Sequence, residues 1–176
     1  IAIPADNGAM LITVGSDTHS SRGGSGLAQK LERTVSVPGI DTYFRISGVS
    51  ATAVANKRDE MERIATIETT ARTKQQELSE RIKVYQLPKD RPAVGDEELQ
   101  PDYAWYNAAE VTPEILALAK PAAIEWIPTE GEYADAQSFK FRGDTGSYFL
   151  VRIAKGLQGF GGYPLAKDYQ VTFQAE

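Results

Sequence analysis

The stretch SFKFRGDTGSYFLVRI, residues 138–153, contains two short segments in which apolar and polar side chains alternate. In the first segment Phe139 and Phe141 alternate with charged residues, and in the second Phe149, Val151 and Ile153 fall on one side. A period of two places every second side chain on the same face of an extended chain. The stretch therefore predicts two β-strands, each with one buried face.

Similar segments occur along most of the chain. They alternate in the same way, or are short and rich in β-branched and aromatic residues, which favour strands. The further candidates are Met10–Val14, Thr34–Val37, Thr42–Ile46, Val49–Val54, Ile64–Thr69, Ile82–Leu87 and Asp168–Phe173. With roughly nine candidate strands separated by turn-forming residues, the pattern is that of an all-β protein.

Two short helices are predicted between the strands. Over Thr73–Arg81, Thr73 and Gln76 have the spacing of a capping box. The sequence Thr112-Pro113-Glu114 is a second start signal, with Thr as N-cap and Pro at the first helical position. Because strands do not alternate regularly with helices, we expect antiparallel pairing and helices that act as connectors.

Acidic residues are concentrated between Asp90 and Asp135, where eleven acids face two bases. Prolines are frequent there, so we expect a long, irregular acidic loop. The fold prediction is thus an immunoglobulin-like antiparallel β-sandwich with two short connecting helices and this loop. Residues 1–39 are expected to form a β-hairpin or small β module, and residues 40–176 the sandwich domain.

The overall composition excludes several classes of protein. The chain has 176 residues, 41% of them apolar, with a net charge of −5 and no cysteine. No apolar run approaches the roughly 18–20 residues of a membrane helix, and a nucleic-acid partner is not expected at this charge. Without cysteine there can be no disulfide, thiol nucleophile or zinc–thiolate site. Because the chain opens at Ile1, we expect a processed chain or a piece of a longer one.

No constellation of residues predicts catalysis, and no cofactor or metal site is predicted. His19, in Asp17-Thr18-His19-Ser20, cannot form a triad with its neighbours, and partners such as Ser50 or Ser147 would have to come from elsewhere. The glycine-rich segment 155–164 is followed by a strand pattern rather than a helix, which favours a turn or Ω-loop over a phosphate cradle. Acidic pairs in the loop, such as Glu97/Glu98 or Glu130/Glu132, are expected to be solvated surface charge. A hydrolase that uses such pairs as catalytic carboxylates is a minor alternative.

Tyr103, Trp105 and Tyr106 form the one predicted contact surface, in the acidic loop. Three neighbouring rings could bind a sugar or another protein. The alternative is that the rings hold the loop against the sandwich.

Residues 42–88 contain motifs that resemble a known family. An extended hairpin, TYFRISGVSATAVAN to IATIET, leads into a short helix and then into the strand VYQLP. Residues 148–173 add closing strands. This order resembles the N-terminal part of bacterial alpha-2-macroglobulin-like proteins. The resemblance covers about residues 40–176, and the first 39 more loosely.

The resemblance implies a non-catalytic module of a periplasmic or cell-envelope protease inhibitor that traps its targets. Some members carry a cysteine-containing thioester, which this chain cannot form. The implied partners are other domains of the parent chain and proteases, with membrane contact only through an anchor outside these residues. The alternative function is a carbohydrate-binding or adhesive module that uses Tyr103, Trp105 and Tyr106.

Overall fold

The computed structural model describes residues 4, 6–93 and 98–176. The chain divides into two compact units, the first ending at Thr42 and the second beginning at Tyr43. The proposed division at residue 39 stays a prediction, and each unit is described by itself.

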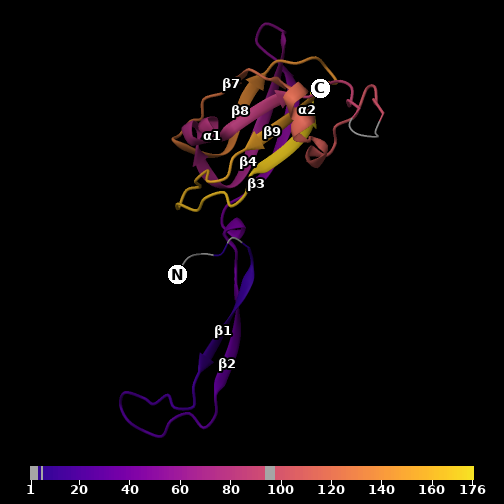
Figure 1. The fold of residues 1–176 in the computed structure, drawn as a ribbon. Helices are drawn as coiled ribbons and strands as arrows, with labels where there is room; N and C mark the ends of the chain where they lie inside the picture. Colours follow the sequence, from indigo (N-terminus) through magenta and orange to yellow (C-terminus); the bar gives the residue numbers. More distant parts are fainter. Residues whose placement is uncertain (1–3, 5, 94–97) are drawn as a thin grey trace. The chain divides into compact units, whose positions relative to one another are not determined.

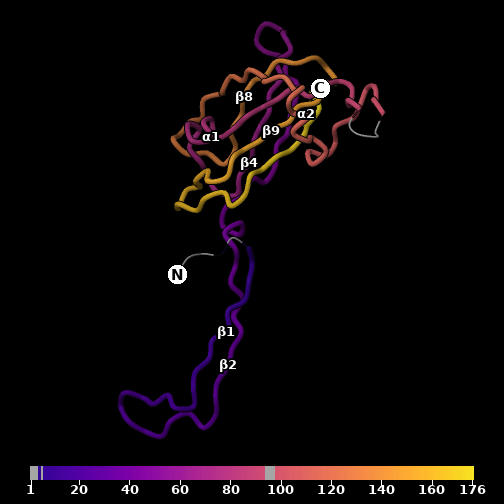
Figure 2. The backbone as a smooth tube through the Cα atoms, viewed as in Figure 1, coloured from indigo at the N-terminus to yellow at the C-terminus, as the bar shows by residue number. Residues whose placement is uncertain are grey.

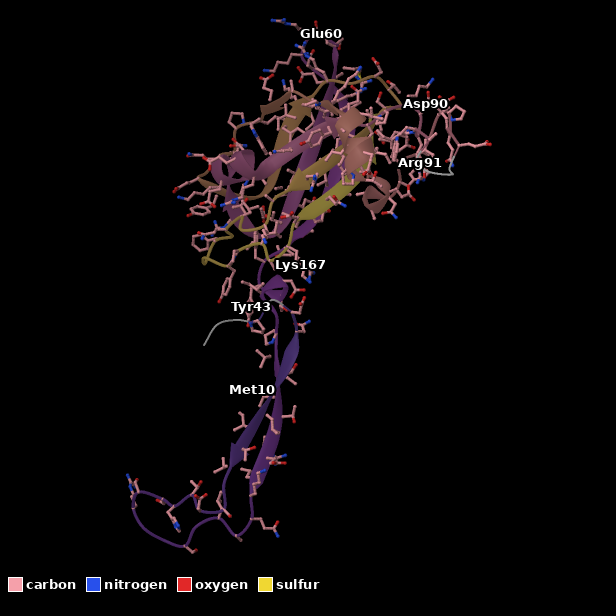
Figure 3. The ribbon with its side chains drawn as sticks, viewed as in Figure 1. Met10, Tyr43, Glu60, Asp90, Arg91 and Lys167 are labelled. Atoms are coloured by element: carbon pink, nitrogen blue, oxygen red, sulfur yellow. The ribbon has the colours of Figure 1, made fainter. Side chains whose placement is uncertain are left out.

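The first unit contains the antiparallel strands β1 (Gly8–Val14) and β2 (Leu31–Val37), followed by the short 3₁₀ helix η1 (Ile40–Thr42). Asn7 joins the base of the hairpin, where its side-chain oxygen accepts a hydrogen bond from the Gly39 N–H at 2.7 Å. Met10 lies on the β1 strand (Figure 3). A two-stranded ribbon by itself is marginally stable in water, because most of its side chains face solvent.

The second unit is a sandwich of two four-stranded antiparallel sheets (Figure 1). One sheet has the order β3-β4-β8-β7 and the other β10-β9-β5-β6. The strands of the first sheet are β3 (Ile46–Ala55), β4 (Met61–Lys74), β8 (Tyr133–Phe141) and β7 (Ile124–Trp126). Those of the second are β10 (Tyr169–Gln174), β9 (Tyr148–Ile153), β5 (Ile82–Gln86) and β6 (Lys120–Pro121). The helices are α1 (Gln75–Arg81), η2 (Ala108–Glu110) and α2 (Pro113–Leu118). The predicted all-β antiparallel fold with two short helices is confirmed.

The main core lies between the two sheets. Phe139 and Phe141 of β8 and Phe149, Val151 and Ile153 of β9 are all buried there, as their alternation predicts. The rings of Phe141 and Phe149, one from each sheet, lie 4.9 Å apart with an edge-to-face tilt, so aromatic contact joins the layers directly.

The connection between β3 and β4 projects beyond the sheets (Figure 2), and Glu60 lies at its tip (Figure 3). Asn56 holds this turn, because its side-chain oxygen accepts hydrogen bonds from the N–H groups of Arg58 and Glu60. Asp59 takes a positive φ of 58°, which aspartate tolerates in tight turns. Residues 57–60 therefore form the tip of the β3–β4 hairpin.

Three local predictions are wrong. Thr42–Ile46 is not a strand, because Thr42 ends η1 and β3 begins only at Ile46. The capping box at Thr73 is absent, since Thr73 is still paired within β4 and its hydroxyl accepts a 2.6 Å hydrogen bond from Gln137. The acidic segment is not irregular throughout, because β6 and β7 lie inside it and pair with β5 and β8.

Candidate functional site

Residues 88–119, here called the cover segment, pack onto the outer face of the β10-β9-β5-β6 sheet; the structure describes them as residues 88–93 and 98–119. Trp105 is at the centre, fully buried against Leu87, Ile115 and Leu150. Its indole N–H donates a 2.8 Å hydrogen bond to the Pro88 carbonyl, so the polar end of the ring is satisfied. This second core buries Leu150 on the outer face of β9, whereas Phe149, Val151 and Ile153 of the same strand face the main core.

The helix α2 supplies part of this second core. Its N-cap is Thr112, whose hydroxyl accepts a 3.5 Å hydrogen bond from the Ile115 N–H, and Pro113 follows at the first helical position. Of its apolar residues, Ile115 is buried and Leu116 packs against the cluster, whereas Leu118 is exposed. The predicted start of this helix is confirmed.

Tyr103 stands beside Trp105 in an edge-to-face contact, with 4.7 Å between ring centres. Its hydroxyl donates to a Glu110 carboxylate oxygen at 2.9 Å and accepts from the Arg91 guanidinium at 3.0 Å. The Arg91 guanidinium also lies over the Tyr103 ring, 5.2 Å from its centre. Since these contacts use both the ring and the hydroxyl, Tyr103 is held in place by the cover segment itself.

Tyr106 differs from its two neighbours because 81% of its surface is exposed. It contacts the edge of Tyr148 on β9, with 5.8 Å between ring centres. Hydrogen bonding with Tyr106, followed by burial, raises the pKa of Tyr148 to about 12. Trp105, by contrast, is fully buried and has no surface to offer a partner. The predicted contact surface stays a prediction, and its accessible part is Tyr106 with half-buried Tyr103.

A hollow of about 590 Å³ lies between the cover segment and the connection from β8 to β9. Tyr103, Lys89 and Asp102 line one side, and Ser147 and Gln174 are among the residues of the other. Lys89 and Asp102 form a 2.9 Å ion pair within the cover segment, and both side chains are largely exposed. This hollow offers mixed polar and aromatic groups that suit a neutral polar ligand.

The other sequence candidates lie apart from this region or have structural contacts. His19 is exposed in the connection between β1 and β2. Of the acidic pairs, Glu97 falls outside the described residues, and Glu132 forms a 2.7 Å ion pair with Lys74. In the described parts of the chain no group of three or more metal-ligating side chains gathers. Among the same residues, no helix combines the length and apolar character needed to cross a bilayer.

The glycine-rich segment 155–164 forms a turn that returns to β10. Gln158 and Pro164 form an antiparallel bridge, and Gly161 and Gly162 have positive φ values of 103° and 83°. Tyr163 stacks on Tyr43 with 4.8 Å between ring centres, so this ring attaches the turn to the sandwich. Because a strand follows the turn, the interpretation as a long turn or Ω-loop is confirmed.

One surface escaped the sequence reasoning, although its signal is visible in the residues. In the register of the β1–β2 hairpin, Met10 faces Val35 and Val14 faces Leu31. Ile12 lies between these pairs on the same face, opposite Arg33, which is the one charged residue among them. Met10, Ile12, Leu31 and Val35 are each more than 40% exposed. We call this surface the apolar hairpin face, and the opposite face carries Leu11, Thr13, Glu32, Thr34 and Ser36. Alternation over residues 8–14 and 31–37 could have identified it.

Comparison with known proteins finds a similarity to a protein named alpha-2-macroglobulin from Rickettsia conorii. The two sequences are 25% identical over 138 residues, which is 78% of this chain and 7% of that protein. No family model matches the chain, and no solved structure matches it. The resemblance indicated by the strand motifs is thereby confirmed: this chain is similar, at a distant level, to a small part of a bacterial alpha-2-macroglobulin.

Proposed function

We propose that this chain is a non-catalytic structural module of a bacterial macroglobulin-like protease inhibitor that acts in the periplasm or cell envelope. The observation that carries the proposal is the similarity to alpha-2-macroglobulin over 138 residues. Because the match spans only 7% of the relative's length, the module would work as one part of a much longer chain. Trapping of proteases would be an activity of the whole protein.

The apolar hairpin face supports a role in packing against another part of that longer chain. An isolated ribbon with one apolar face gains stability when that face is covered. Met10, Ile12, Leu31 and Val35 would contribute most of the buried area. The partner surface we assign is therefore an apolar patch on another module of the same polypeptide.

Limited proteolysis of the full-length gene product tests the trapping role. Cleavage by several unrelated proteases should change its shape, measured by small-angle scattering, and should reduce the proteases' activity on large protein substrates but not on small peptides. If cleavage leaves both the shape and the activity unchanged, the inhibitor proposal is wrong.

Hydrogen exchange tests the packing of the hairpin. The β1 and β2 amides should exchange more slowly in the full-length product than in residues 1–176 alone. Ile12→Lys should remove that difference, because it places a second positive charge directly opposite Arg33 on the apolar hairpin face. Leu11→Lys is the matched control on the opposite face, where the side chain is 61% exposed. Equal exchange in both proteins would contradict hairpin docking and leave the trapping role to the proteolysis test.

A carbohydrate-binding or adhesive role is the second candidate, and the hollow beside Tyr103 is the observation that favours it. The exposed Tyr106 ring would add a stacking surface at the neighbouring sheet face. A glycan array tests this role: a bound sugar should lose affinity with Tyr103→Ala or Tyr106→Ala, and absence of any binding would reject the candidate.

A further inference from the structure

The cover segment leaves part of the outer face of the β10-β9-β5-β6 sheet exposed. On the covered part lie Tyr85 and Leu150, which are opposite each other in the register of β5 and β9. The next outward pair along the same strands is Lys83 and Arg152, again directly opposite. Arg81 precedes β5 on the same side, at the end of α1. Three cations thus gather where the cover segment ends.

These three cations have no anionic partner in the parts of the chain that the structure describes. Arg81 donates a 3.4 Å hydrogen bond to the Lys155 carbonyl, and among the described residues no ion pair involves Arg81, Lys83 or Arg152. The nearby Asp168 uses a carboxylate oxygen to accept a 2.9 Å hydrogen bond from the Lys155 N–H. Directly opposed like charges destabilise a strand pair, so the Lys83–Arg152 pair opposes folding rather than supporting it.

The cations surround a shallow hollow of about 190 Å³, which Tyr85 and Asp168 also line. Lys83 and Arg81 are exposed and Arg152 is half-buried, so a ligand can reach all three. Guanidinium and ammonium groups bind carboxylates through charge-assisted hydrogen bonds, and arginine can do so with two parallel bonds. The ring of Tyr85 offers apolar contact beside them.

We propose that this cationic hollow, formed by Arg81, Lys83 and Arg152, binds the carboxylates of an acidic peptide segment. Charge complementarity is the main argument, since these cations stand together in a chain whose net charge is −5. Three cations and the Asp168 carboxylate line the hollow, so a peptide segment with two neighbouring carboxylates would balance their charge. The proposal is independent of the proposed inhibitor function.

Fluorescence anisotropy with a labelled hexaglutamate peptide tests the proposal on the 176-residue chain at low ionic strength. The double variant Lys83→Gln/Arg152→Gln should bind about tenfold more weakly, because two charge-assisted contacts are lost. The matched control is Lys57→Gln/Arg58→Gln at the β3–β4 tip, which removes the same charge and should change the affinity less than about twofold.

Each outcome decides the proposal. A loss of peptide affinity in the Lys83→Gln/Arg152→Gln variant alone supports the proposal. This variant should also melt at or above the temperature of the unmodified chain, because it removes two opposed like charges. Equal losses in both double variants would show non-specific attraction and overturn the proposal. Absence of peptide binding would overturn the proposal too. The same holds if inorganic phosphate displaces the labelled peptide at a lower concentration than unlabelled hexaglutamate does.

Discussion

Replacement of Trp105 by alanine tests whether the cover segment is held by a core. The indole is fully buried against Leu87, Ile115 and Leu150, and its N–H bonds the Pro88 carbonyl at 2.8 Å. Loss of a buried tryptophan costs about 3–5 kcal/mol in free energy of unfolding. About 1 kcal/mol of this is the hydrogen bond, which leaves the Pro88 carbonyl without its donor.

Urea denaturation followed by far-ultraviolet circular dichroism measures this loss. With a slope of about 2 kcal/mol per molar urea, the midpoint should fall by about 1.5–2.5 M. Trp105→Phe should lie between the parent and the alanine variant, because it keeps part of the ring volume and loses the N–H donor. Tyr106→Ala is the control: this ring is 81% exposed, so the change should cost about 1 kcal/mol or less.

A Trp105→Ala variant within about 1 kcal/mol of the parent would refute the reasoning. The same holds if Trp105→Ala and Tyr106→Ala cost equal amounts. Either result would mean that the second core does not hold the cover segment on the sheet.

Two further changes test other parts of the sandwich. Glu62 pairs with Lys140 at 2.8 Å, and hydrogen bonding to Lys140 lowers the pKa of Glu62 below its ordinary value of 4.5. The pair therefore stabilises the fold at pH values above 4.5, and this stabilisation is lost as the pH falls through the lowered pKa of Glu62. Glu62→Gln should accordingly reduce the decrease in unfolding free energy that is measured as the pH is lowered through this range. Gly159→Ala should cost about 1–3 kcal/mol by overpacking, since its Cβ would stand 2.7 Å from a ring carbon of buried Phe44. The control Gly48→Ala meets nothing within 4 Å and should cost less than Gly159→Ala in a thermal melt, whereas equal costs would contradict the steric argument.

Local alternation was sufficient to predict the β8 and β9 strands and their inward faces. A period of two places Phe149, Val151 and Ile153 on the same face of the strand, and this apolar face is the buried one. The start of α2 at Thr112 and Pro113 was equally local, since capping depends on residues within one helical turn. By contrast, Thr73 failed as a cap because a partner 64 positions away, Gln137, holds it in the sheet.

The sequence by itself determined an antiparallel β protein without cysteine chemistry, because strand periodicity and composition are properties of the chain alone. Tertiary structure decided which side chains share a surface. Leu150 lies between two inward-facing residues and therefore points to the outer face of β9, where an apolar side chain indicates a covered surface. The sequence did not show that Trp105 covers it. The meeting of Lys83 with Arg152 likewise depends on strand register, which is set by contacts between segments about seventy residues apart.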